Sequence, residues 1–375
     1  MRIVVNTRLL IENKLDGIGW FTYETLKRIT KKHPEHQFYF LFDRKFSDDF
    51  IFSKNVIPVI LNPPARHPVL WFLWFEVSVK KILKRINADL FLSPDGYLSL
   101  SSNVKQISVI HDINFVHRPE DLPFFARKYY NRFFPKFAKK AVKIATVSEY
   151  SKQDISSRFD IAKDKITVVY NGSNDIYKPV SEEIKIKIRR EYTEGKPYFV
   201  FIGTLHPRKN IARLFAAFNK FKKETGSDFK LVIIGTKMFM TGDIDKAYSE
   251  SEFKNDIIFT GRLNPEDLHY VLASAFAMTF VPLFEGFGIP LIEAMNCEVP
   301  VIASNTTSLP EVAGDAALFV NPFDINEIKN AMIKIVDDNF LRNELIKKGN
   351  IRKRAFSWDT TADKLWDVVI EAYGK

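Results

Sequence analysis

The stretch MTFVPLFEGFGIPLIEAM, residues 278–295, passes from an apolar strand through a glycine-containing loop into a helix. Residues 278–283 have the character of a buried strand. Pro290 suits the first helical position, and the apolar residues that follow it form one face of the helix. A strand, a tight loop and a helix in this order predict one unit of a doubly wound α/β sheet.

Two carboxylates lie eight residues apart across this loop, Glu285 in the loop itself and Glu293 one turn into the helix. The backbone N–H groups at Phe287 and Gly288 are expected at the positive end of the helix, where a diphosphate binds, and Gly288 allows close approach of the backbone. Two carboxylates beside such a diphosphate-binding site indicate that the hydroxyls of a sugar bind between them. Taken alone, the pair is also compatible with chance spacing and ordinary compensation of the helix dipole.

The same alternation of apolar runs and amphipathic segments extends in both directions along the chain. At 375 residues the chain exceeds what one hydrophobic core usually supports, so two domains are expected. The polar stretch at residues 177–183 is the predicted linker. Strands are predicted at residues 3–6, 38–42, 88–92, 107–110 and 145–147 in the first series, and at 198–202, 230–234, 257–260, 278–283, 299–302 and 317–320 in the second.

A basic turn follows the first strand of the second series, where Gly203 leads to Arg208 and Lys209 before the next helix. Arg offers a planar fork of donors and Lys a mobile point charge, so together they can neutralise a diphosphate leaving group. A solvated basic turn is the alternative interpretation of this segment alone.

In the first series, polar residues follow the strands at the edge where α/β sheets bind ligands. Gly17 lies in the loop before the first helix, and His111 and Asp112 directly follow a strand. Asp95, in a Ser-Pro-Asp-Gly sequence at another strand end, is a candidate for lining an acceptor cleft, although a plain turn explains it equally well.

The segment from residue 284 to 314, with its Glu-x7-Glu spacing, resembles retaining glycosyltransferases of family 4, which have the GT-B fold of two Rossmann-like domains facing across a cleft. The resemblance covers nearly the whole chain and is strongest over residues 198–322. It implies an acceptor-side domain at 1–177, a donor-binding domain at 178–357, and a C-terminal helix, 358–375, that crosses back to the first domain.

The resemblance also implies roles for individual residues. Arg208 and Lys209 match the pair that binds the donor diphosphate, and His111 matches a histidine that orients the donor sugar. Asp112 is a neighbour that orients the histidine or approaches the acceptor. Gly17 matches the second glycine of the family's Gly-Gly loop, whereas Asp16 replaces the first, which leaves the acceptor contacts of this loop open.

The activity implied is transfer of mannose, rhamnose or glucose from a nucleoside-diphosphate sugar to a hydroxyl acceptor. The expected acceptor is a glycan or lipid-linked oligosaccharide of O-antigen or capsule synthesis. Glu285 is expected to contact the sugar and Glu293 the ribose hydroxyls. No Asp-x-Asp metal motif lies in a suitable loop, and Arg with Lys can replace a metal, so we expect no metal and no cofactor.

A formal charge of +10 favours anionic partners. The first residues lack the apolar region of a signal peptide, and Cys297 is the single cysteine, so a cytoplasmic location is expected. The apolar run at 69–75 is too short to span a membrane. Segments 71–85 and 124–140 both predict helices with an apolar stripe and a cationic face. They are compatible with peripheral docking on an anionic membrane and with packing on the sheet.

Three other functions fit parts of the sequence. A sugar-nucleotide epimerase or a phosphorylase shares the GT-B fold, but Arg-Lys and Glu-x7-Glu fit transfer better. A basic nucleic-acid-binding protein is favoured by charge alone, whereas no nucleic-acid motif is found and the aromatic residues fall at core periods. An inactive GT-B scaffold is disfavoured because every matched donor-site residue is present.

Overall fold

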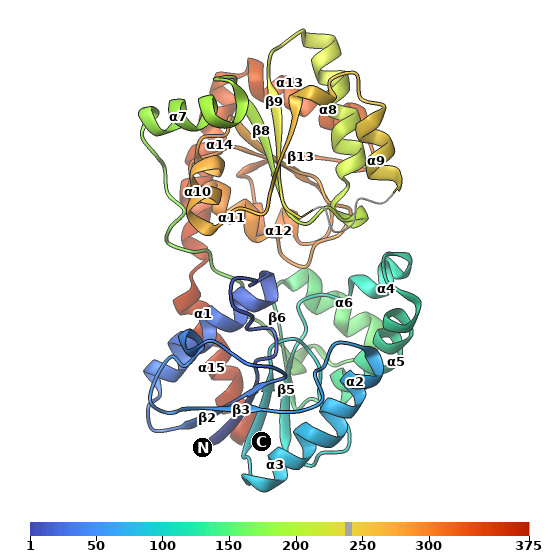
Figure 1. Cartoon of the computed structure of the whole chain (residues 1–375), viewed down its shortest axis with the longest axis vertical. Helices are drawn as coiled ribbons and strands as arrows, with labels where there is room; N and C mark the ends of the chain where they lie inside the picture. Colours follow the sequence, from blue (N-terminus) through green and yellow to red (C-terminus); the bar gives the residue numbers. More distant parts are fainter. Residues whose placement is uncertain (237–241, 375) are drawn as a thin grey trace. The chain divides into compact units, whose positions relative to one another are not determined.

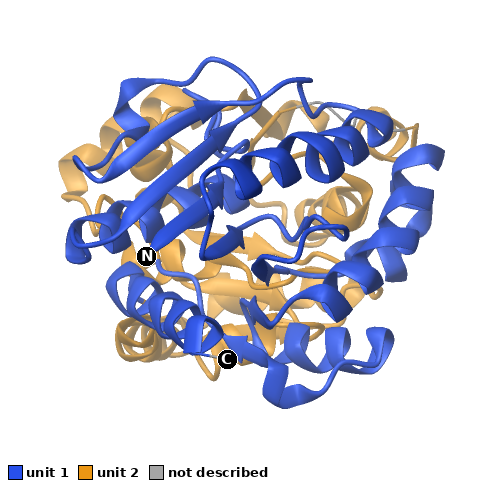
Figure 2. Ribbon diagram, turned by 90° about the horizontal axis from the view of Figure 1, so that it is seen from below, with its two compact units in different colours: residues 1–172, 357–375 blue, residues 173–356 orange. Residues whose placement is uncertain are grey.

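A computed structural model of the protein describes residues 1–236 and 242–374. The chain forms two compact units, shown in different colours in Figure 2. Unit 1 comprises residues 1–172 and 357–375, and unit 2 comprises residues 173–356. Figure 1 shows a sheet with helices on both faces in each unit.

Unit 1 contains, within the described residues, a seven-stranded parallel sheet in the order β3-β2-β1-β4-β5-β6-β7. Its central strands are buried on both faces, as in β1, where Ile3, Val4 and Val5 have no exposed surface. The strands are β1 (Arg2–Asn6), β2 (Gln37–Phe42), β3 (Val56–Ile60), β4 (Leu90–Ser93), β5 (Lys105–Val109), β6 (Lys143–Thr146) and β7 (Ile166–Val168). The helices are α1 (Gly17–Lys32), α2 (Pro68–Leu73), α3 (Lys80–Arg85), α4 (Asn114–His117), α5 (Phe124–Lys140), α6 (Glu149–Phe159) and α15 (Trp358–Gly374).

Unit 2 contains a six-stranded parallel sheet, counted over its described residues, in the order β10-β9-β8-β11-β12-β13. Strand β8 is fully buried and lies in the middle of the core. The strands are β8 (Tyr198–Ile202), β9 (Lys230–Ile234), β10 (Ile257–Gly261), β11 (Ala277–Phe280), β12 (Val301–Ser304) and β13 (Ala317–Val320). The helices are α7 (Glu182–Thr193), α8 (Ile211–Thr225), α9 (Gly242–Ser249), α10 (Pro265–Ala273), α11 (Ile289–Asn296), α12 (Leu309–Ala313), α13 (Ile325–Asp337) and α14 (Asn339–Arg352).

The strand order reverses direction once in each sheet. In unit 1 the reversal lies between β1 and β4, and in unit 2 it lies between β8 and β11. At such a point the loops after the two strands diverge to opposite faces and leave a crevice where ligands of α/β sheets bind. The loops that follow β8 and β11 contain Arg208, Lys209 and Glu285. The topology therefore brings the predicted diphosphate turn and the first carboxylate to one place.

The C-terminal helix α15 belongs to unit 1, where it packs against α1, β5 and β6. Its apolar face is buried, and its polar face forms ion pairs such as Lys32 Nζ to Asp363 Oδ1 at 2.6 Å. The chain leaves unit 1 after Gly172, where an added Cβ would lie 2.4 Å from the backbone nitrogen of Trp358. The boundary lies five residues before the linker predicted at Tyr177, because the Tyr177 side chain packs into the core of unit 2.

None of the helices described by the structure is both long enough and apolar enough to cross a membrane. The predicted helix at 71–85 is interrupted: α2 and α3 are joined by a π-helical stretch at residues 74–79.

Candidate active site

The loops after β8 and β11 are joined by the backbone and by one buried side chain. The N–H of Leu283 donates to the carbonyl of Arg208 at 2.8 Å. Asn210 is 3% exposed, and its Nδ2 donates to the carbonyls of Val281 at 3.0 Å and Pro322 at 2.7 Å. Arg208 and Lys209 lie in a single helical turn, Pro207–Lys209, in which the N–H of Arg208 donates to Nδ1 of the His206 ring at 3.3 Å. These bonds fix the direction in which the two basic side chains leave the turn.

Arg208 and Lys209 both point at one oxygen of Glu285. Arg208 Nη1 lies 2.8 Å from Glu285 Oε1 and 3.1 Å from the carbonyl of Phe284. Lys209 Nζ forms an ion pair with the same Oε1. Burial alone would raise the pKa of Glu285, but the charges of Lys209 and Arg208 outweigh it and hold that pKa below its ordinary value. The carboxylate is therefore ionised, and the three side chains keep a net positive charge.

The loop at residues 305–308, after β12, holds Glu285 from the other side. The N–H of Glu285 donates to Thr307 Oγ1 at 3.3 Å. Ser308 Oγ donates to the carbonyls of Glu285 at 2.9 Å and Phe287 at 3.1 Å. The buried hydroxyl of Thr306, in the same loop, has no hydrogen-bond partner among the described residues. Sequence reasoning had assigned no role to these hydroxyls, because they lie more than 20 residues from Glu285 in the chain.

Gly288 directly precedes helix α11 and has a conformation that favours glycine. Its φ is +101°, and an added Cβ would lie 2.5 Å from Leu309 Cδ2. Phe287 is 3% exposed and packs its ring edge-on against Phe356 at 5.7 Å between centroids. Pro290 is the second residue of the helix, one position later than predicted. The start of α11 is thus fixed by packing on both sides of the glycine.

Glu293 lies one turn into α11 beside Tyr177 and Cys297. Burial raises the pKa of Glu293 to about 7, and the hydrogen bond from the Tyr177 hydroxyl lowers it only in part. The carboxylate therefore changes its protonation state near neutral pH. Sequence reasoning missed Tyr177 as the partner of Glu293, because the tyrosine falls in the predicted linker.

Gly203 follows β8 and lies against a second glycine, Gly235, at the end of β9. A Cβ added to Gly235 would lie 2.0 Å from the carbonyl oxygen of Gly203. The close approach of the two backbones requires glycine at position 235, which the sequence interpretation did not single out.

In unit 1, His111 follows β5 and is held by two contacts. Its Nε2 lies 2.8 Å from the carbonyl of Pro94, and its ring meets Phe21 edge-on at 4.9 Å. Because a carbonyl only accepts, Nε2 carries a proton. Burial lowers the pKa of His111, so the ring is neutral near pH 7 and Nδ1 is an acceptor.

Asp112 and Asp95 have local partners. Asp112 Oδ1 accepts hydrogen bonds from the backbone and side chain of Asn114 at 2.9 and 2.8 Å, at the start of α4. Asp95 is 8% exposed, and its carboxylate binds Arg8 Nε at 2.6 Å and Asn6 Nδ2 at 2.7 Å. Neither Arg8 nor Asn6 was singled out from the sequence. Asp95 therefore joins the ends of β1 and β4 through a buried ion pair.

Gly17 is the first residue of α1, and the Asp16 side chain caps the helix by accepting from the N–H of Gly19 at 3.0 Å. A Cβ added to Gly17 would meet no atom within 4 Å. Packing within unit 1 therefore does not require glycine here.

Comparison with known proteins divides the chain into two parts that correspond closely to the two compact units. Residues 15–175 match the family model described as Glycosyltransferase Family 4, and residues 182–352 match the model Glycosyl transferases group 1. The O-antigen chain mannosyltransferase B of Escherichia coli is 30% identical over 370 residues, which cover 96% of this chain and 97% of that protein. The O-antigen chain mannosyltransferase RfbU of Salmonella typhimurium is 29% identical, over 75% of this chain and 74% of its own length.

Among solved structures, HepE of Anabaena in complex with UDP and glucose has a TM-score of 0.75 at 16% identity, and 99% of each chain is covered. At 16% identity, this similarity shows a shared fold and nothing further. The two parallel sheets with helices on both faces are those of the GT-B fold.

Proposed function

The chain belongs to the family 4 glycosyltransferases, and from this premise we propose that it transfers a hexose, mannose first among the candidates, from a nucleoside-diphosphate sugar to a hydroxyl of a glycan acceptor. The observation that carries the proposal is the cluster of Arg208, Lys209 and Glu285 where the strand order of unit 2 reverses. Support for mannose comes from the O-antigen mannosyltransferases to which the chain is similar over most of its length.

The cluster suits a reaction in which negative charge develops on a diphosphate. Two cations share one carboxylate, so positive charge remains for the phosphate oxygens. As the bond between the sugar carbon and the diphosphate breaks, this charge stabilises the leaving group. Glu285 is held ionised and can face the positive charge that develops on the sugar. The start of α11 at Phe287 and Gly288 supplies the favourable end of a helix dipole to the same anion.

We further propose that the anomeric configuration is retained. In this mechanism the acceptor oxygen bonds to the sugar carbon on the face from which the diphosphate leaves, and the acceptor proton passes to a diphosphate oxygen. No separate base is required. His111, neutral with Nδ1 as an acceptor, is suited to receive a hydrogen bond from a sugar hydroxyl. Glu293 is suited to accept from the ribose hydroxyls when it is ionised.

Metal independence is part of the proposal. Arg208 and Lys209 can supply the positive charge with which a divalent ion would otherwise neutralise the diphosphate. Transfer should therefore persist in EDTA.

The proposed acceptor is a lipid-linked oligosaccharide, and the proposed location is the cytoplasm, with peripheral contact at the membrane. Two proteins to which the chain is similar, over 96% and 75% of its length, are O-antigen chain mannosyltransferases, which supports a glycan acceptor. A lipid-linked acceptor places the enzyme at a bilayer surface.

The test is a transfer assay with GDP-mannose, UDP-glucose and dTDP-rhamnose as donors and octyl α-mannoside as acceptor. We expect a glycoside product from one donor in the presence of EDTA, with the donor's anomeric configuration shown by proton NMR. Inversion would contradict the retaining mechanism alone. Epimerised nucleotide sugar without a glycoside would replace the proposed function with the epimerase alternative.

A further inference from the structure

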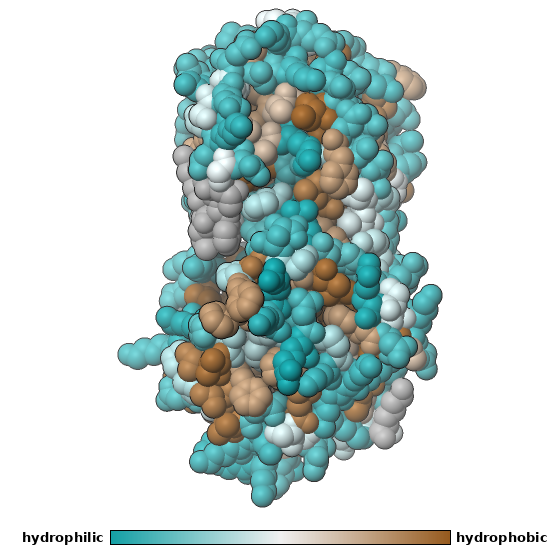
Figure 3. Space-filling model, turned by 90° about the vertical axis from the view of Figure 1, so that its right-hand side faces the viewer, coloured by the Kyte–Doolittle hydropathy of each residue, from teal (hydrophilic) through white to brown (hydrophobic). Residues whose placement is uncertain are grey.

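One face of unit 1 exposes large apolar side chains from two helices. On α2 and the π-helical stretch after it, Val69 is 61% and Val77 56% exposed; on α5, Phe125 is 67% exposed. Phe72, Leu73 and Phe124 are also exposed on the same two segments. In the lower half of Figure 3, apolar atoms gather in a patch with polar atoms around it. We call the surface formed by residues 67–77 and 124–136 the α2–α5 face. Contiguous exposure of this kind marks a surface that meets a partner.

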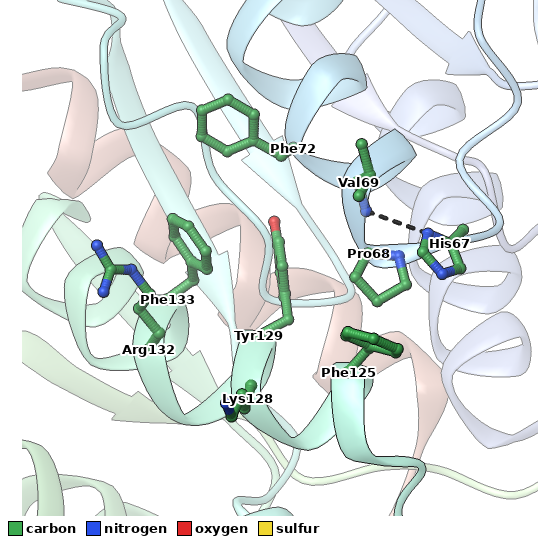
Figure 4. A pocket seen from close by; sticks show the side chains of 9 residues that line it. All are labelled: His67, Pro68, Val69, Phe72, Phe125, Lys128, Tyr129, Arg132 and Phe133. Atoms are coloured by element: carbon green, nitrogen blue, oxygen red, sulfur yellow. Dashed lines mark hydrogen bonds between the residues drawn. The ribbon is translucent and has the colours of Figure 1, made fainter.

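The α2–α5 face is hollowed by a pocket of about 320 Å³. Its lining comes from the start of α2 and from successive turns of α5, and Figure 4 shows these side chains from close by. The ring centroids of Phe72 and Phe133 lie 6.0 Å apart across the two helices, and those of Tyr129 and Phe133 lie 4.5 Å apart. The walls are therefore mainly hydrocarbon, and they suit an apolar group.

Cations of α5 lie beside the apolar surface, and the one acid within the α2–α5 face, Glu76, accepts hydrogen bonds from the backbone N–H groups of Leu100 and Ser101. Helix α5 contains Arg127, Lys128, Arg132 and Lys136 in its first thirteen residues and has no acidic residue. Lys128 Nζ lies 4.4 Å from the ring centroid of Phe124, and Lys136 Nζ lies 5.7 Å from that of Phe133. Among the residues that the structure describes, none of these four cations forms an ion pair with a carboxylate. Their charge is therefore available to an anionic partner.

We propose that the α2–α5 face docks on an anionic lipid bilayer, and that its pocket takes an acyl chain of a lipid whose phosphate lies against Lys128 and Arg132. Aromatic rings at the boundary with cations beside them form the pattern of an interfacial helix surface. Membrane docking by this face would hold the enzyme where a lipid-linked acceptor is found. Only this purpose of the docking rests on the proposed function.

Two other occupants fit less well. A second copy of the chain that met this face through twofold symmetry would place the cations of both α5 helices against each other. A nucleic acid would match the charge, but it would leave the apolar pocket empty, because base stacking uses exposed ring faces and not a hydrocarbon pocket.

The first experiment is vesicle flotation with the full chain. Vesicles of phosphatidylglycerol with phosphatidylcholine are compared with vesicles of phosphatidylcholine alone, at low and high salt. We expect binding to the anionic vesicles that weakens with salt, since surface charges are screened. The double variant Lys128→Glu/Arg132→Glu should lower partitioning at least about tenfold, given about 1 kcal/mol per charge near the surface. Phe72→Ser/Phe125→Ser should lower it at both salt concentrations.

Matched controls lie on unit 2. Lys334 of α13 and Phe340 of α14 are exposed. Lys334→Glu and Phe340→Ser introduce the same residue types, Glu and Ser, as the variants of the α2–α5 face. Both should bind vesicles like the unchanged protein. Circular dichroism verifies folding of each variant, and the thermal shift with GDP and UDP reports the site in unit 2. Loss of vesicle binding with an unchanged nucleotide shift separates the α2–α5 face from the donor site.

A second measurement tests insertion of the pocket rim. Phe125→Trp places a fluorophore at the most exposed large apolar side chain of the rim, and lipids with brominated acyl chains quench indoles that reach the hydrocarbon. We expect quenching beyond that of the unchanged protein, and none when Lys128→Glu and Arg132→Glu are also present. Three results would overturn the inference: no flotation at either salt concentration, equal binding by the two double variants and the controls, or self-association through this face in place of lipid binding.

Discussion

At the scale of single residues, Glu285 is shared by two cations, and a donor diphosphate has to compete for them. Arg208 and Lys209 contact the same carboxylate oxygen. In Glu285→Gln the cations lose their charged partner, so we expect a nucleoside diphosphate to bind at least as tightly as before. Transfer should fall by about 100-fold or more, because charge on the sugar is no longer stabilised. Steady-state rates and calorimetric titration with the nucleotide measure the two effects.

Lys209→Ala should act differently on the same cluster. It leaves the buried Glu285 with one cation, so the free energy of unfolding should fall by about 2 kcal/mol. Nucleotide affinity and transfer should both fall, since the lysine contributes to both. Chemical denaturation and the same titration give the values. Near-native turnover in both Lys209→Ala and Glu285→Gln would remove the cluster from the mechanism.

Glu293 gives the site a pH dependence. Its pKa is raised to about 7 from 4.5, so the folded protein binds more protons than the unfolded chain between these values. Stability from this group is fully present below pH 4.5 and is lost as the pH rises through 7. The loss amounts to at most about 3.5 kcal/mol for this shift, since each pKa unit corresponds to about 1.4 kcal/mol. In Glu293→Gln this fall should disappear, so the variant should gain stability relative to the unchanged protein between pH 5 and 8.

Nucleotide affinity should follow the opposite trend. Ribose hydroxyls donate to an ionised carboxylate, so affinity should rise with pH up to about 7 and then level off. Titrations from pH 5.5 to 8 with the unchanged protein and with Glu293→Gln measure this effect. An affinity profile that is the same in both proteins would show that Glu293 does not hold the ribose.

At the scale of elements, the start of α11 depends on glycine. In Gly288→Ala, the new Cβ would lie 2.5 Å from Leu309 Cδ2 at a φ of +101°. We expect a loss of about 2 kcal/mol of stability, from strain and from displacement of Leu309. Nucleotide binding should weaken as well, because the helix end moves. Thermal denaturation with and without nucleotide provides both measurements.

Gly17, at the start of helix α1, should respond to substitution differently from Gly288. Gly17→Ala places a Cβ where no atom lies within 4 Å, at the first helical position, so stability should stay equal or rise slightly. If a ligand approaches this backbone as the family resemblance implies, transfer should fall without any loss of stability. Unchanged transfer would assign Gly17 no part in ligand binding.

The elements that sequence reasoning predicted are those with strong apolar runs. Eleven strand predictions correspond to strands of the two sheets, because parallel strands buried on both faces read as continuous apolar segments. Strands β3 and β7 are not among the eleven; β7 has only three residues, and β3 contains Pro58 and half-exposed residues. Strand β3 lies at the edge of the sheet, where proline is tolerated. The π-helical stretch at 74–79 was missed because its apolar pattern resembles that of a continuous helix.

The candidate site was predictable where its residues follow strands, and much less so where they act through tertiary contacts. Arg208, Lys209 and Glu285 were found from their turns, but their shared ion pair requires the strand order. Ser308 and Tyr177 are ordinary residues in the sequence. They gain their importance from backbone carbonyls and a carboxylate that are far away in the chain.

At the scale of the whole molecule, the two units differ in how they are assembled from the chain. Unit 2 is one continuous segment with its own core, whereas unit 1 needs α15 from the end of the chain. Helix α15 contributes Trp358, Leu365 and Val369 to the buried core of unit 1. Residues 173–356 should therefore unfold cooperatively as an isolated fragment. Residues 1–172 without α15 should aggregate or lack a cooperative transition, as followed by circular dichroism during heating.

The central claim is that unit 2 binds a nucleoside diphosphate through the Arg208, Lys209 and Glu285 cluster. Thermal denaturation with GDP, UDP, dTDP and ADP tests it most directly, since a ligand at 100 times its Kd stabilises the fold by about 2.7 kcal/mol. The account predicts a clear shift with one base, lost in Lys209→Ala and kept in Lys334→Ala. No shift with any of the four, or a shift that Lys209→Ala leaves unchanged, would contradict it.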